Sequence, residues 1–239
     1  DGGDVLVWTD SSPAGNNAVY NASNGYGELP PVYDAMNSMA NDKATVRFNN
    51  QNALELDLTA LVGSDYTVFV VNGRDRAGLA NFYIAGSDPL SDSNLVLGYE
   101  NPALLRQSHF NRDLDVSVES YSGTPVWSLD AFRFSQTEGK DLFHNGALVA
   151  TDNEVSPLVS NIGTTLGHFR AFGPFYWFQG DLAEVIVYDR ALSETERMSV
   201  EVTLLLRYGL PVDVENYVPC ETDWRNHGGY VSTLAQFVE

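Results

Sequence analysis

Two short stretches of the chain hold the residue types that recognise sugars. The stretch 106–113 concentrates guanidinium, imidazole and amide groups in a chain that is otherwise poor in cations, and 172–178 concentrates aromatic rings. Aromatic rings cover the apolar CH face of a sugar ring, while amides, carboxylates and guanidinium groups bond its hydroxyls. We therefore predict ligand-binding roles for Arg106, His109, Asn111, Arg133, Tyr176 and Trp177.

Both stretches also have a purely structural interpretation. Residues 106–113 fit a solvated pair of strands, and the aromatic residues of 172–178 fit core or edge packing. Alternation along a strand would bury either Phe175 with Trp177 or Tyr176 with Phe178, leaving the other pair at the surface. The sequence leaves this choice open.

Composition narrows the possible partners. The chain has 13 Lys+Arg against 32 Asp+Glu, a net charge of −19, which repels the phosphate backbone of nucleic acids. No apolar stretch approaches the roughly 20 residues that span a bilayer, and the lone Cys220 cannot form an internal disulfide. Acidic, Asn- and Gly-rich loops are typical of proteins outside the cell. Because the chain starts at Asp1 without a leader pattern, we expect a part of a longer exported or cell-surface protein.

The elements that must position these residues are strands. Hydrophobic residues recur with a period of two, and strands are expected over 5–8, 44–48, 54–58, 66–71, 81–85, 95–99, 114–119, 126–134, 141–144, 147–150, 164–167 and 181–188. Asn145-Gly146 predicts a hairpin and Asn72-Gly73 a left-handed turn. About a dozen strands at this spacing indicate a β-sandwich or barrel. The connection 11–43 is much longer than most and is therefore functional or mobile.

One segment is helical instead. Ser193 and Glu196 form an S-x-x-E capping box, after which apolar residues recur at helical spacing up to Arg207, followed by Gly209 and Pro211. We predict a helix over 194–207 that covers an open edge or end of the sandwich. The composition changes after this point, so 1–210 is expected to be the domain and 211–239 a C-terminal extension or linker.

Several separated strings resemble a known family. The run Gly180-Asp181-Leu182-Ala183-Glu184-Val185-Ile186-Val187-Tyr188, continuing into the predicted helix and Tyr208-Gly209-Leu210, resembles the C-terminal pattern of laminin-G-like jelly-roll domains. These belong to the concanavalin A-like lectin/glucanase superfamily. The strings at 7–12, 44–49 and 142–146 agree in order, so the resemblance covers roughly 5–210. It implies two curved antiparallel sheets packed face to face, with Arg47, Arg133, Asp115 and Ser117 on outer faces.

The resemblance also implies what an enzyme of this superfamily would show. Its glycoside hydrolases have E-x-D-x-E or a close variant on one strand, since two carboxylates must flank the scissile bond. Glu55-Leu56-Asp57 begins that pattern, but Thr59 and Ala60 stand where the second glutamate is needed. A polysaccharide lyase would pair histidine with tyrosine and arginine, for which Arg106, His109 and Tyr121 are the candidates. We expect no catalytic residues and keep a hydrolase or lyase as the weaker alternative.

Calcium is a candidate structural ion. It prefers clustered carboxylate and amide oxygens, and Asp113 and Asp115 supply two of these on one strand face. Their stretch is no EF-hand loop, because Val118 stands where glycine is required. In jelly rolls similar to this one a calcium ion often lies where loops meet strand ends, which adds Asp181 to the candidate ligands. Alternatively, these carboxylates only keep the surface soluble.

Together these features predict an all-β, two-sheet antiparallel jelly-roll sandwich with one capping helix near 194–207. We expect a non-catalytic binding module for carbohydrate or a glycan-like surface polymer. A structural or adhesion domain that binds protein and has no sugar site is the alternative.

Overall fold

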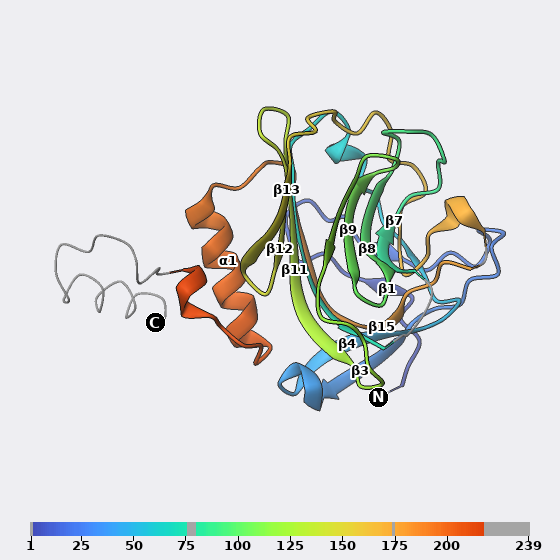
Figure 1. Ribbon diagram of the computed structural model, residues 1–239. Coiled ribbons are helices and arrows are strands. Elements are labelled where there is room, and N and C mark those ends of the chain that lie inside the picture. Colours follow the sequence, from blue (N-terminus) through green and yellow to red (C-terminus); the bar gives the residue numbers. More distant parts are fainter. Residues whose placement is uncertain (1, 76–79, 174, 218–239) are drawn as a thin grey trace, which may run out of the picture.

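Two antiparallel sheets stacked face to face form the body of the protein (Figure 1). The computed structural model describes residues 2–75, 80–173 and 175–217. Among these, one sheet has eight strands in the order β1 (Val7–Trp8), β2 (Ala18–Val19), β5 (Leu54–Glu55), β14 (Thr165–Leu166), β7 (Asn81–Ala85), β8 (Leu95–Asn101), β9 (Leu104–His109) and β10 (Asp113–Ser117). The other has seven, in the order β13 (Ala147–Asp152), β12 (Gly139–His144), β11 (Val126–Ser135), β6 (Tyr66–Arg74), β15 (Gln179–Tyr188), β4 (Lys43–Asn49) and β3 (Val32–Asn37). The predicted jelly-roll sandwich is confirmed.

The core lies between the sheets because alternate residues of each strand point inward. Val68 and Val70 of β6 and Phe132 of β11 come from the seven-stranded sheet, and Leu95 and Leu97 of β8 come from the other. All are fully buried. Burial of one such side chain contributes about 1.5–3 kcal/mol, so this layer supplies most of the stability of the fold.

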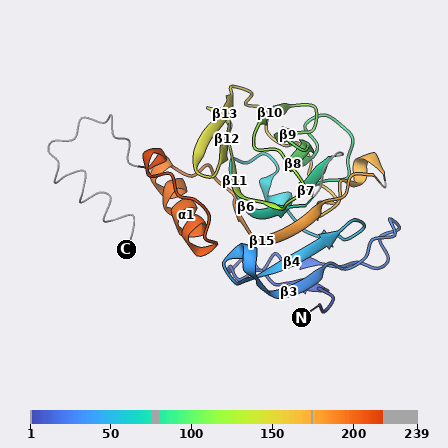
Figure 2. The ribbon, with the colours of Figure 1, turned by 60° about the horizontal axis from the view of Figure 1, so that its bottom comes forward.

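The helix α1 (Glu194–Arg207) covers the outer face of the seven-stranded sheet, as Figures 1 and 2 both show. The predicted bounds and capping box are confirmed: the Ser193 hydroxyl accepts from the Glu196 N–H, and the Glu196 carboxylate accepts from the Ser193 N–H. The helix packs on a sheet face, which differs from the expected edge or end. Strands β6 and β11 explain the choice, since Phe69 and Leu129 give that face an apolar surface to bury.

Packing against the helix continues past the predicted domain boundary at 210. Leu210 and Tyr217 are buried in the cluster beneath α1, close to the short 3-10 helix η4 (Val214–Asn216). Most of the predicted extension, 218–239, lies outside the described residues. No helix among the described residues is long and apolar enough to cross a membrane.

Two turn predictions had different outcomes. Asn145-Gly146 joins β12 to β13, as predicted, with both residues at positive φ. The turn predicted at Asn72-Gly73 is wrong, because both residues lie within β6 and pair with neighbours on each side. Gly73 has a packing role instead: a Cβ there would lie 2.4 Å from the ring of Trp127, so the glycine lets that indole lie against the backbone.

Candidate functional site

A small hollow opens on the outer face of the eight-stranded sheet. The strand register aligns Phe82 of β7, Gly98 of β8, Arg106 of β9 and Asp115 of β10 in one row across four strands. Gly98 puts no side chain between Phe82 and Arg106. The cavity beside this row has a volume of about 130 Å³ and is lined by Phe82, Val96, Glu100, Arg106, Ser108, Phe110, Asn111, Asp113, Phe169, Phe172 and Tyr176.

Aromatic rings form one wall of this hollow. Phe169 is buried, and its ring meets Phe172 nearly edge to face at 5.0 Å between centroids. Phe172 also contacts Tyr176 at 5.4 Å and Phe110 at 5.6 Å. The short helix η3 (Arg170–Phe172) presents Phe172 to solvent with 49% of its surface exposed. This wall therefore offers an apolar, partly exposed ring held in place by other rings.

A guanidinium and two carboxylates, Arg106 with Glu100 and Asp113, also line the hollow, and Asp115 lies next to them. Arg106 donates from Nε and Nη2 to the two Asp115 oxygens, each at 2.8 Å, and from Nη1 to Glu100 Oε2 at 2.8 Å. Its Nη2 also lies 3.3 Å from Asp113 Oδ2. Burial raises the pKa of Glu100, and the neighbouring Asp115 and Asp113 add to this effect against the opposing charge of Arg106. The negative charge of this cluster is therefore only partly neutralised.

The turn between β9 and β10 completes the rim. Phe110 and Asn111 both have positive φ, at 21° and 67°, and asparagine tolerates this region better than most residues. Asn111 Nδ2 donates to the Ser91 hydroxyl at 3.1 Å, which leaves its carbonyl oxygen at the exposed edge. A planar amide thus stands beside the aromatic wall.

The hollow brings together three of the six predicted ligand-binding residues: Arg106, Asn111 and Tyr176. His109 belongs to the same strand as Arg106 but points into the sandwich, where Tyr66 and the carbonyl of Ser156 bond its ring. Alternation along β9 explains this separation, since residues 106 and 108 face outward and 107 and 109 face inward.

Trp177 lies in a different place, stacked on the ring of His168 at 3.5 Å between centroids. It is buried, as is Phe178, while Phe175 is exposed and Tyr176 half-buried. Neither predicted alternation of this segment is therefore correct. Residues 175–178 lie in an irregular stretch before β15, where an isolated β-bridge pairs Trp177 with His168.

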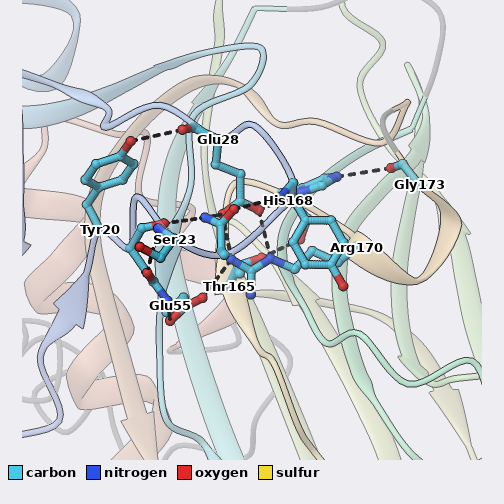
Figure 3. Close-up of polar contacts among 11 residues, drawn as sticks. Tyr20, Ser23, Glu28, Glu55, Thr165, His168, Arg170 and Gly173 are labelled. Atoms are coloured by element: carbon cyan, nitrogen blue, oxygen red, sulfur yellow. Dashed lines mark hydrogen bonds and ion pairs between the residues drawn. The ribbon is translucent and has the colours of Figure 1, made fainter.

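At His168, a buried ionic network holds the long N-terminal connection against the sheet (Figure 3). Glu28 accepts from His168 Nδ1 and Arg170 Nε, both at 2.8 Å, and Arg170 also bonds Glu55 at 2.9 Å. Burial disfavours the charge of Glu28, but the bonds from Arg170 and His168 outweigh it and hold its pKa below the ordinary value. Glu55, the acid of the incomplete hydrolase pattern, is thus part of an anchor, with Asn21 on its other oxygen.

Arg133 lines a larger hollow on the opposite side of the sandwich, between α1 and the β12–β13 hairpin. This hollow has a volume of about 810 Å³. Arg133 is engaged there by Asp141, Glu138 and the carbonyl of Leu192. Phe143 supplies the only aromatic ring among the described lining residues, and it is buried with Arg197 over its face. No exposed ring in this lining could therefore cover a sugar face.

The three predicted calcium ligands do not converge on one point. Asp113 and Asp115 share Arg106 on the outer face of the eight-stranded sheet. Asp181 belongs to the seven-stranded sheet, where Arg47 donates to it at 2.8 Å and burial raises its pKa against that partner. Among the described residues, no group of three or more His, Cys, Asp or Glu side chains has the spacing of a metal site. This donor set does not fit one structural calcium ion.

The lyase triplet is not assembled either. Arg106 faces outward, His109 faces the core, and the hydroxyl of Tyr121 donates to Asp75 at 3.1 Å. Sequence reasoning missed Glu100, Phe110 and Phe169 as lining residues, and it included Phe172 only as a member of the aromatic stretch 172–178. Strict alternation would have grouped Glu100 and Arg106 on one face, but nothing local indicates that Phe169 and Phe172 reach across from a distant loop.

Solved structures share this architecture. The CBM40 carbohydrate-binding module of a Ruminococcus gnavus sialidase, bound to α2,6-sialyllactose, is similar at a TM-score of 0.53 and 18% identity, covering 66% of this chain and 96% of its own. Domain 4 of an extracellular arabinanase from Geobacillus stearothermophilus, in complex with arabinotriose, is similar at 0.55 and 17%, covering 72% and 81%. A Trypanosoma rangeli sialidase is similar at 0.59 and 13%, covering 83% of this chain and 31% of its own.

These likenesses show the fold. No protein-family model and no curated protein sequence matches the chain. The neighbours support the two-sheet jelly-roll sandwich and do not single out the laminin-G-like group.

Proposed function

We propose that the chain is a non-catalytic carbohydrate-binding module of an exported or cell-surface protein, and that the hollow beside Phe172 is its sugar site. One observation supports this more than any other: a half-exposed ring, a planar amide and a guanidinium–carboxylate cluster border the same hollow. Rings cover the CH face of a sugar, and amides and carboxylates bond its hydroxyls.

The neighbours support the proposal at the level of fold. Two of them were solved with a sugar bound, the CBM40 module with sialyllactose and domain 4 of the arabinanase with arabinotriose. A fold hosts many functions, so the site chemistry and not the likeness is the main argument.

The carboxylates also support a non-catalytic role. Retaining glycosidases need two carboxyl groups about 5–5.5 Å apart, one of them free to act as nucleophile. Glu100 and Asp113 line the hollow and both pair with Arg106, and the neighbouring Asp115 is held by the same guanidinium. Glu55 is held by Arg170 and Asn21. We therefore expect binding without cleavage.

A glycan array followed by affinity measurements on the best ligand tests the proposal. Phe172→Ala should weaken binding roughly tenfold, since it removes the exposed ring of the wall. Phe175→Ala is the matched control: it removes a ring that is 65% exposed and does not line the hollow, so binding should be unchanged.

Three outcomes would contradict the proposal. A blank array with folded protein would favour the adhesion alternative, and equal effects of the two variants would place the site elsewhere. Release of new reducing ends from any bound glycan would show catalysis.

A further inference from the structure

The charge of the hollow differs from what a sugar acid requires. Among the lining residues that the structure describes, Arg106 is the only cation, and Glu100, Asp113 and Asp115 surround it. The next cation along the chain, Arg112, pairs with Asp92 and Glu154 and does not line the hollow. A carboxylate ligand would therefore meet three carboxylates and a guanidinium whose three nitrogens each already bond a carboxylate.

We propose that this site selects its glycan by charge: it favours a sugar with a protonated amine, accepts an uncharged sugar less well and rejects a sugar acid. This inference rests on the proposed function and assigns the ligand class of the same site.

The geometry gives an amine a defined place. Among the described residues, Glu100 Oε1 has no hydrogen-bond partner, while Oε2 is bonded to Arg106. Glu100 borders the hollow with 37% of its side chain exposed, so an incoming donor can reach it. Burial raises the pKa of Glu100, and the negative charges of Asp115 and Asp113 add to this effect against the charge of Arg106. An ammonium group would bond this carboxylate, and the ring of Phe172 or Tyr176 would cover the sugar face.

The contrast with the CBM40 neighbour is informative. That module was solved with sialyllactose, an acidic glycan, on a similar fold. Here the corresponding type of ligand would add a fourth negative charge to the cluster. The net charge of −19 on the whole chain also disfavours acidic glycans, because it repels them as they approach the protein.

Calorimetric titration with two matched ligand pairs tests the inference, with EDTA present so that no divalent cation neutralises the cluster. A glucosamine tetramer should bind roughly tenfold more tightly than an N-acetylglucosamine tetramer at about pH 6, where the amines are protonated. Lactose should bind more tightly than sialyllactose. The preference for the amine should shrink as salt is added, because screening weakens the charge term and leaves the steric difference unchanged.

Glu100→Gln should lower the ratio of glucosamine to N-acetylglucosamine affinity about threefold. Glu215→Gln removes the same charge at an exposed position in η4, outside the hollow, and should leave the ratio unchanged. Equal affinity for the two tetramers, a salt-independent ratio, or tight sialyllactose binding would overturn the inference while the proposed function stands. Failure of every glycan to bind would overturn both.

Discussion

His109 is a buried base whose two ring nitrogens have different partners. Nδ1 donates to the carbonyl of Ser156 at 2.8 Å, and Nε2 accepts from the hydroxyl of Tyr66 at 2.9 Å. Gln107 donates to the same hydroxyl, which leaves Tyr66 free to donate to His109. Burial, and then the charge of Lys140, lower the pKa of His109 from 6.5 to about 4. The ring is therefore neutral in the folded protein at neutral pH.

This arrangement predicts acid sensitivity. Between pH 6.5 and about pH 4 the unfolded chain binds a proton at this residue and the folded chain does not. Stability is therefore fully present above pH 6.5 and falls as the pH falls, by on the order of 3 kcal/mol in total. His109→Gln should remove this part of the slope in urea unfolding measured across that range.

The prediction can also be tested on the unmodified protein, in case the variant folds poorly. Titration of the His109 ring by NMR should show a neutral imidazole down to about pH 5. A ring that protonates at its ordinary pKa, or parallel unfolding curves for variant and parent, would contradict the prediction.

At the scale of elements, α1 contains a buried group, Glu201, whose pKa is raised rather than lowered. Glu201 lies in the buried face of the helix, beside its partner Arg197 and near Tyr217. Burial outweighs the charge of Arg197 and raises the pKa of Glu201 from 4.5 to about 7. The helix therefore docks most favourably when this carboxyl is protonated.

Stability from Glu201 is fully present below pH 4.5 and is lost as the pH rises to about 7. The loss of unfolding free energy is on the order of 3 kcal/mol. Its pH window overlaps that of His109, and the two effects have opposite signs. The stability of the parent protein should therefore change less with pH than that of either variant. Glu201→Gln should remove the loss, even if Arg197 without its counter-charge lowers stability at every pH.

Glu194→Gln is the matched control for Glu201, because it removes the same charge from the exposed first turn of the same helix. Its unfolding profile should follow that of the parent. If Glu201→Gln follows the parent as well, the carboxyl titrates as it would in water and the explanation is wrong.

The elements also show where sequence reasoning succeeds. The bounds of α1 follow from a capping box and a helical apolar repeat, which act within a few residues of one another. The turn expected at Asn72-Gly73 does not form, because contacts with distant strands decide the structure there. Pairing of β6 with β11 and β15 overrides the local turn preference. The local sequence also does not predict that the indole of Trp127 packs against Gly73.

At the scale of the whole molecule, contacts between distant parts of the chain decide which residues form the site, and local sequence patterns do not predict such contacts. Alternation along β9 is sufficient to separate Arg106 from His109, so that part was predictable. The aromatic wall was not, because Phe172 reaches the hollow from a loop more than sixty residues away from Arg106 along the chain. Asp181 was added to Asp113 as a candidate calcium ligand because it stands at the head of a strand, whereas the topology places the two residues in different sheets.

Placement of these carboxylates predicts the response to chelation. Each candidate ligand already has a guanidinium partner, Arg106 for Asp113 and Asp115 and Arg47 for Asp181. We expect EDTA to leave the melting temperature unchanged, and added calcium to raise it by no more than added magnesium does. A calcium-specific rise in thermal unfolding would restore calcium as a structural ion and require ligands other than this set.

The buried network around Glu28 has a consequence for the order in which the protein can assemble. Its partners His168 and Arg170 follow it by 140 and 142 residues, and β5 likewise completes its sheet with β14. During synthesis on the ribosome, Glu28 and β5 must therefore wait for partners that emerge more than a hundred residues later. Until then chaperones and proteases meet this part of the chain as an open polypeptide, and closure of the sandwich is a late, cooperative event.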